Sequence, residues 1–174
     1  MTRLITILIL LIFVSCRQAN EKSADTIIAL DTNYMDQILK PFQLTLKNTD
    51  YSMASILQYV LTDKDFKIIF KGVLEGEKDS ILFRTEIKSS KSLVKLSNIN
   101  LDSLQSDYSN PCIQDGSQIT ITISKDNKSK TVHLSNYFQP DIGYAIEHIN
   151  SLTPKKYQIW YDKVKLIRDQ EMCK

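Results

Sequence analysis

Strict alternation of apolar and polar side chains on either side of one turn is the feature that most limits how this chain can fold. Ile119, Ile121 and Ile123 alternate with threonine and serine, and the alternation resumes at Val132 and Leu134. Successive side chains of a β-strand point to opposite faces, so the pattern predicts a hairpin with one apolar and one polar face. The turn is Asp126-Asn127, and both residue types tolerate the positive φ angles of a two-residue hairpin turn. The predicted register pairs Ile121 with Val132, Ile119 with Leu134, Thr122 with Thr131, and Thr120 with His133.

Three other segments alternate in the same way, and each is predicted to be a strand. The first contains Phe42, Leu44 and Leu46. The second is 80–88, and the last lies close to the C-terminus. We expect Ile81, Phe83 and Ile87 to face inward in the second, with Arg84, Glu86 and Lys88 outward, and we expect Tyr157, Ile159 and Tyr161 to share one side of the last, with Trp160 on the other.

The segment 52–61 fits two structures. Its apolar residues have the spacing of an amphipathic helix, but they also fit a strand that forms a hairpin with 66–70. In the hairpin, the turn falls at Asp63-Lys64 and all the apolar pairs share one face, so we favour this structure. The predicted register pairs Leu61 with Phe66, Tyr59 with Ile68, and Leu57 with Phe70.

One long helix is predicted over 140–152, because Pro140 suits a first helical turn and Pro154 follows the last. Its apolar stripe consists of Ile142, Ala145, Ile146, Ile149 and Leu152. Shorter helical segments are expected at 35–39, 97–108 and 164–172. The fold class is therefore α+β: an antiparallel sheet of about five to seven strands, with the helix 140–152 packed on one face. All of it belongs to a single globular domain, 26–174, a length that suits one domain.

The first sixteen residues have the pattern of a secretion signal. Arg3 precedes the apolar run Leu4 to Val14, which is shorter than the roughly 20 residues needed to span a bilayer. Val14-Ser15-Cys16 then places a small residue directly before a cysteine. An uncleaved anchor and an ordinary signal peptide cut elsewhere are the alternatives.

This segment resembles the signal peptides of bacterial lipoproteins. The resemblance implies a signal peptide at 1–15, acyl chains on Cys16 that attach the protein to the membrane, and a polar tether at 16–25. The predicted order of elements also resembles small envelope lipoproteins of Gram-negative bacteria, in which hairpins precede one long helix and a last strand. That resemblance implies a place in the cell envelope, at the outer membrane facing the periplasm, and it brings no active site.

The three cysteines divide into one that would carry lipid and two that remain. Cys112 and Cys173 would then lie in a compartment that permits disulfides, so we expect them to be bridged. The alternative is two unrelated thiols, with Cys173 in a frayed C-terminus.

No residue grouping in the sequence is typical of catalysis, metal binding or phosphate binding. His133 and His148 lack the spacing of zinc ligands, and the four glycines occur singly. Asp63 and Asp65 fit turn and surface carboxylates, without the loop pattern of a calcium site. Without such groupings we expect no cofactor. The formal net charge is +2 with no basic stripe, so we also expect no nucleic-acid partner.

Aromatic residues give the one indication of a binding surface. Tyr137, Phe138 and Trp160 are predicted near the end of the 119–134 hairpin and on the last strand, and tyrosine and tryptophan are frequent anchors of protein interfaces. Burial of Phe138 in the core is the alternative. The sequence therefore favours a membrane-anchored, non-catalytic binding module, such as an inhibitor, an immunity protein or a subunit of an envelope complex, with a protein partner in the envelope. The alternative function is an envelope hydrolase acting on cell-wall or glycan material, whose paired acids cannot be identified from sequence spacing.

Overall fold

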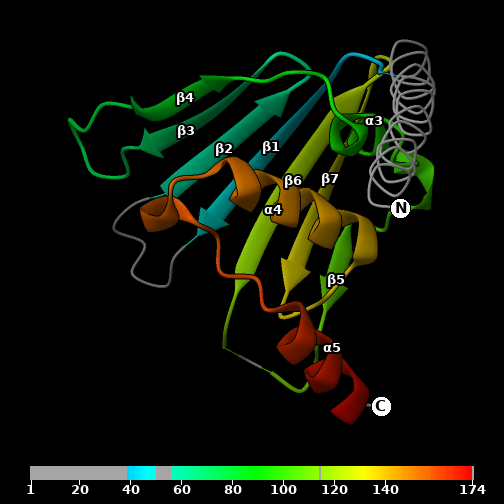
Figure 1. Ribbon diagram of the computed structural model, residues 1–174. Helices are drawn as coiled ribbons and strands as arrows, with labels where there is room; N and C mark the ends of the chain where they lie inside the picture. Colours follow the sequence, from blue (N-terminus) through cyan, green and yellow to red (C-terminus); the bar gives the residue numbers. More distant parts are fainter. Residues whose placement is uncertain (1–38, 50–55, 114, 174) are drawn as a thin grey trace, which may run out of the picture. The chain divides into compact units, whose positions relative to one another are not determined.

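The structure, a computed structural model, describes residues 39–49, 56–113 and 115–173 (Figure 1). In these residues the fold is α+β, with one seven-stranded sheet in the order β4-β3-β2-β1-β6-β7-β5. All neighbouring strands are antiparallel except β5 and β7, which are parallel. The strands are β1 Phe42–Thr49, β2 Ile56–Thr62, β3 Asp65–Lys71, β4 Ser80–Glu86, β5 Asp107–Ser109, β6 Gln118–Lys125 and β7 Lys128–Ser135; the helices are α3 Lys91–Ser97, α4 Pro140–Leu152 and α5 Lys163–Met172, with short 3₁₀ turns at Leu101–Ser103 and Lys155–Tyr157.

Both predicted hairpins form with the predicted registers. In β6–β7, Ile121 lies opposite Val132 and Thr122 opposite Thr131, and the turn residues Asp126 and Asn127 have φ angles of 49° and 59°. In β2–β3, Leu61 lies opposite Phe66, Tyr59 opposite Ile68 and Leu57 opposite Phe70, so the ambiguous segment is a strand from residue 56 onward. β1, also predicted, pairs with β2 on one side and β6 on the other.

The two faces of the sheet differ sharply in polarity. We call the apolar face, which includes Leu44, Phe66 and Ile121, the inner face; these side chains have no exposed surface. The opposite, outer face carries hydroxyl pairs such as Thr122–Thr131, whose oxygen atoms lie 2.9 Å apart. The inner face and the helices share one hydrophobic core, which includes Leu93 and Leu96 of α3 and Ile142, Ala145, Ile146 and Ile149 of α4.

Helix α4 has the predicted bounds and the predicted buried stripe. Pro140 occupies its first turn, and the side-chain oxygen of Gln139 caps the helix by accepting a hydrogen bond from the Ile142 amide at 2.7 Å. Figure 1 draws α4 across the sheet, with α5 beyond the lower ends of β5 and β7. One main helix is predicted from the sequence, but in the described part of the chain α3 and α5 also bury side chains.

A β-bulge changes which residues of β4 face inward. Ile68 pairs with Phe83, but Ile69 pairs with Ile81, so Leu82 is an extra residue in this strand. The side chain of Ile81 therefore shares the outer face with Ile69 and is 59% exposed. The prediction that Ile81 faces inward is wrong, while Phe83 and Ile87 do pack against the core.

The predicted last strand does not form. Tyr157 ends a 3₁₀ turn, and residues 158–161 belong to no strand. The side chains nevertheless point in the predicted directions. Ile159 is buried, Tyr157 and Tyr161 pack against the core, and Trp160 is exposed. The alternation of apolar and polar residues thus predicts which side chains are buried, but it does not predict whether the backbone pairs with another strand.

The segment 97–108 also differs from the prediction. It contains one 3₁₀ turn and the start of β5, and the α-helix lies before it, at α3. Ile99, Leu101 and Leu104 are buried, in agreement with their apolar character. The predicted helix at 35–39 lies almost wholly outside the described residues, as do the signal segment, Cys16 and the tether.

Candidate functional site

The aromatic residues Tyr137 and Phe138 follow β7 after one intervening residue, Asn136, and lie against other aromatic rings. The Tyr137 ring lies 5.4 Å from the Tyr108 ring, and the Phe138 ring lies 6.0 Å from the Tyr161 ring, measured between centroids. The Tyr161 hydroxyl donates a hydrogen bond to the Tyr137 carbonyl at 3.3 Å. Both Tyr137 and Phe138 are half-buried, so each ring has one side in the fold and part of its surface in solvent.

Two polar contacts fix the backbone of this aromatic segment. Asn136 adopts a positive φ of 51° at the end of β7, and its buried side-chain oxygen accepts a hydrogen bond from the Ser117 amide at 2.9 Å. One residue beyond Tyr137, the Phe138 amide donates to the side-chain oxygen of Gln170 in α5 at 2.7 Å. The aromatic segment is therefore held between the end of the β6–β7 hairpin and α5.

Trp160 is held outward by its neighbour in the sequence. Ile159 is 3% exposed and exchanges two hydrogen bonds of 2.8 Å with the Asn150 side chain of α4. This anchoring leaves Trp160 with 55% of its surface exposed. The structure brings Phe138 next to Tyr161, but within the described residues it records no ring contact between Trp160 and either Tyr137 or Phe138. We call Tyr137, Phe138, Trp160 and Tyr161 together the aromatic edge.

The predicted disulfide ties α5 to the segment after β5. The structure contains the bond between Cys112 and Cys173, with 5.8 Å between their Cα atoms. Because α5 also supplies Gln170, the disulfide holds the helix that positions Phe138.

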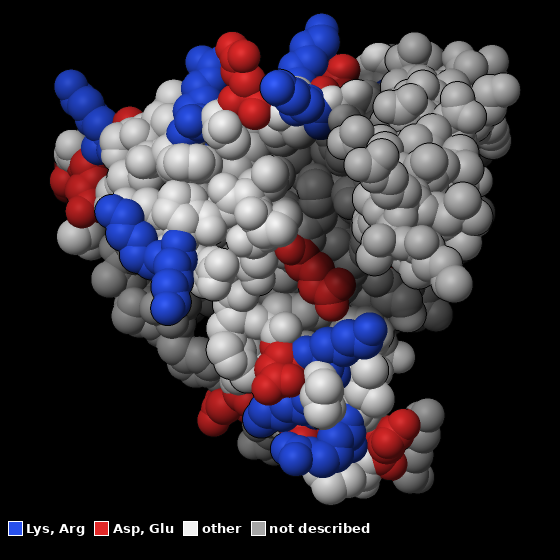
Figure 2. All heavy atoms as spheres, viewed as in Figure 1, with Lys and Arg blue, Asp and Glu red and all other residues white. Residues whose placement is uncertain are grey.

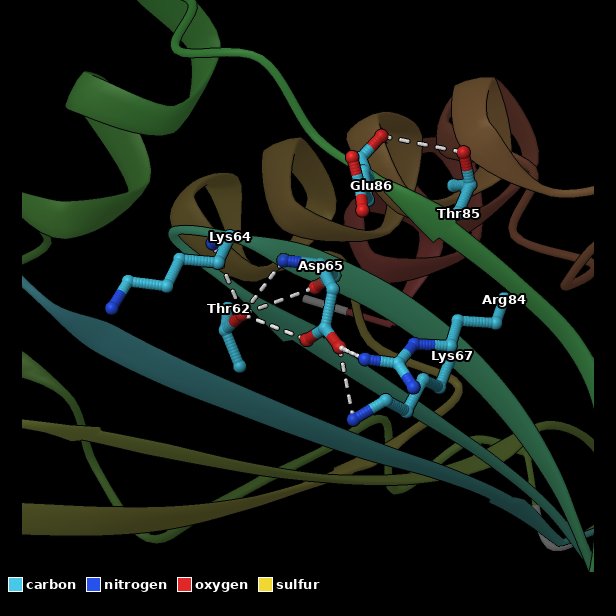
Figure 3. A network of polar contacts seen from close by, with 7 residues as sticks. All are labelled: Thr62, Lys64, Asp65, Lys67, Arg84, Thr85 and Glu86. Atoms are coloured by element: carbon cyan, nitrogen blue, oxygen red, sulfur yellow. Dashed lines mark hydrogen bonds and ion pairs between the residues drawn. The ribbon is translucent and has the colours of Figure 1, made fainter.

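Apart from the aromatic edge, a cluster of charged and polar side chains lies at the β2–β3 turn, on the outer face of the sheet (Figure 3). The Asp65 carboxylate lies 2.9 Å from Lys67 Nζ and 3.0 Å from Arg84 Nη2. It also accepts a hydrogen bond from the Thr62 hydroxyl at 3.0 Å, and that hydroxyl accepts from the Lys64 and Asp65 amides. A shallow hollow of about 540 Å³ lies beside this cluster and is lined by Thr62, Asp63, Lys64, Asp65, Arg84, Glu86 and Ile87.

The chemistry of Asp65 suits an anchor between strands. The hydrogen bond from Lys67 holds the pKa of the Asp65 carboxyl below its usual range, and contacts with Thr62 and Arg84 act in the same direction. A general acid needs a raised pKa to hold its proton near neutral pH. Asp65 therefore joins the β2–β3 turn to β4, as expected of a turn carboxylate, and it does not fit the role of a proton donor.

The two histidines lie on different elements and in different surroundings. His133 is exposed on the outer face, where its Nδ1 lies 3.0 Å from the Thr120 hydroxyl. His148 lies in α4, where burial lowers its pKa. In the residues that the structure describes, no three metal-ligating side chains gather into a possible metal site.

Charged side chains of both signs are spread over the face that carries α4, and they gather most densely around α5 (Figure 2). The middle of that face shows few charges.

No helix in the described ranges has both the length and the apolar character needed to cross a membrane. No family model, curated protein or solved structure matches this chain.

Proposed function

We propose that this protein is a lipoprotein of the bacterial cell envelope, anchored through lipid on Cys16, and that it is a non-catalytic binding module for another envelope protein. The observation that carries the binding proposal is the exposure of Trp160 on a segment fixed by Asn150. A rigid, exposed tryptophan costs little conformational entropy on binding and is a common anchor of interfaces. In this proposal α4 is the main cover of the inner face, and the aromatic edge beyond it is the contact surface.

The alternative, a hydrolase of cell-wall or glycan material, has weaker support from the geometry. Such an enzyme needs two carboxyl groups facing one cleft, one of them with a raised pKa. The hollow beside Asp65 is shallow, and the pKa of Asp65 is lowered by its cationic neighbours. A binding role at a membrane needs no such pair, since tethering raises the effective concentration toward partners in the same membrane.

The anchor is tested by changing Cys16 to Ala. Wild-type protein from the membrane fraction should begin at residue 16 and carry acyl chains, as measured by intact mass, because the cysteine thiol is the acceptor of the lipid. Cys16→Ala should keep residues 1–15 and carry no lipid. Ser15→Ala is the matched control: it keeps a small residue before Cys16 and should be processed like the wild type. Release of a cleaved, unlipidated Cys16→Ala protein would contradict the proposed anchor.

The contact surface is tested by Trp160→Ala in a pull-down from envelope extract with the lipidated protein as bait. We expect capture of the partner to fall at least roughly tenfold, because truncating an interface anchor costs about 2 kcal/mol or more. Leu74→Ala is the matched control, since Leu74 is a similarly exposed apolar side chain on the β3–β4 loop, at 65%. Equal capture by wild type and Trp160→Ala, with unchanged circular dichroism, would reject the aromatic edge as the contact surface.

A further inference from the structure

Strand β4 is the long free edge of the sheet. The sheet ends at β4 on one side and at β5 on the other, and β5 has three residues whereas β4 has seven. Within the described part of the chain, β4 pairs only with β3. An edge strand presents main-chain N–H and C=O groups that can pair with another strand, so proteins usually blunt such edges.

The bulge blunts only the first half of this edge. After Leu82 the pairing with β3 is regular, with Phe83 and Thr85 on the inner face and Arg84 and Glu86 on the outer face. The Ile87 amide continues the ladder by donating to the Lys64 carbonyl at 2.9 Å. Because main-chain groups of an antiparallel strand alternate in direction, those of Arg84 and Glu86 point toward the free edge.

The outer side of this half-strand carries an unbalanced charge. Glu86 lies directly opposite Asp65, and like charges in opposing positions are unfavourable. The cations nearby, Lys67 and Arg84, both contact Asp65. No ion pair of Glu86 is seen among the described residues, so a cation arriving at the edge would relieve this repulsion.

We propose that two copies of this chain associate by pairing residues 83–87 of β4 antiparallel, about a two-fold axis at Thr85. Arg84 of each copy then lies opposite Glu86 of the other. The main-chain groups of both residues point toward the free edge, so the two residues can exchange N–H···O hydrogen bonds across the new pair. On the inner face, the half-buried Phe83 of each copy meets Ile87 of the other. A shift of two residues in either direction would oppose two arginines or two glutamates, so the charges select this register. The paired segment is short, and the dimer is accordingly weak and concentration-dependent.

The first test places a cysteine on the two-fold axis of purified full-length protein. Opposed residues that do not share hydrogen bonds have Cα atoms about 4.5 Å apart, close enough for a disulfide. Thr85→Cys should therefore form a covalent dimer on mild oxidation, with residue 85 linked to residue 85 by peptide mapping. Ser80→Cys is the control: it is more exposed than Thr85 on the same strand but lies far from the axis, and it should remain monomeric.

The second test uses the charges. Arg84→Glu gives a chain with two acidic residues at these positions, and Glu86→Arg gives a chain with two basic ones. For each variant alone, the dissociation constant of the dimer measured by sedimentation equilibrium should be at least roughly tenfold higher than for the wild type, because two favourable charge pairs become two repulsive ones. An equimolar mixture of the two should recover association, since every pair is then again of opposite sign.

Three results would overturn the proposal: no covalent dimer of Thr85→Cys, equal cross-linking of Ser80→Cys, or a mixture of charge variants that associates no better than either alone. Thermal melts by circular dichroism establish that each variant is folded. Cross-linking of Thr85→Cys in membranes to a different protein would also overturn it, in favour of a partner strand on β4. Since none of these variants changes the aromatic edge, failure of the dimer proposal leaves the proposed contact surface at Trp160 unaffected.

Discussion

Replacing Cys112 with serine should lower the free energy of unfolding by about 4 kcal/mol, which is the largest loss that we expect from any single substitution in the described chain. The bridged residues are 61 positions apart, and a cross-link over that span restricts the unfolded chain strongly. The loss should appear as a lower urea midpoint in equilibrium unfolding followed by circular dichroism.

Two comparisons separate the disulfide from the side chain itself. Cys173→Ser should show the same loss, and the double variant should show no more than either single one, because all three lack the same bond. Reduction of the wild type should reproduce the effect. If the reduced wild type kept the midpoint of the oxidised protein, the expected contribution would be wrong.

Ile146→Ala should cost about 3 kcal/mol of unfolding free energy, because it leaves a cavity in a core from which water is excluded. Ile146 has no exposed surface and lies in the cluster shared by α4 and the sheet. Glu147→Ala, at the next position of the same helix, is the control: its side chain is exposed, and surface substitutions usually change stability by less than about 0.5 kcal/mol. Equal losses for the two variants would show that α4 does not pack as described.

The hairpins could be predicted because their two faces differ completely in chemistry. A shift of one residue in β6–β7 would move Ile121 and Val132 into solvent and threonines into the core, so only one register satisfies both faces. The turn residues Asp126 and Asn127 agreed with that register, since both adopt positive φ angles. Local turn chemistry and the apolar pattern thus indicated the same structure.

The errors arose where a side-chain pattern does not determine the backbone. Tyr157, Ile159 and Tyr161 alternate as a strand would, but none of the described strands pairs with them, and Asn150 supplies the hydrogen bonds of Ile159 instead. In β4 the bulge at Leu82 reverses which side chains face inward, and no residue type in this segment is a sequence signal for a bulge. The short helix α3 was missed, although Ser90 before it caps the helix by accepting from the Leu93 amide at 3.3 Å.

The candidate site was predictable in part. The sequence placed Tyr137 and Phe138 after the β6–β7 hairpin and Trp160 on the side opposite Ile159, but it did not indicate that the ring partners of Tyr137 and Phe138 are Tyr108 and Tyr161. It could not indicate the hydrogen bonds that hold these segments, because Gln170 and Asn150 are common polar residues, 32 residues from Phe138 and nine from Ile159 respectively. The edge properties of β4 depend on strand order, which no local pattern contains.

The place of β1 in the sheet has a consequence for the order in which the chain can fold. β1 lies between β2 and β6, and β2 follows it closely, whereas β6 is synthesised about 70 residues after β1. Strands β1 to β4 can therefore assemble first as a meander, during which β1 is a temporary edge with Leu44 and Leu46 still exposed. Docking of the β6–β7 hairpin then closes that edge, and α5 must be in place before Cys173 can reach Cys112. We expect the nascent chain to be most prone to aggregation in this interval, because β1, which is the central strand of the completed sheet, is then still an unpaired edge strand.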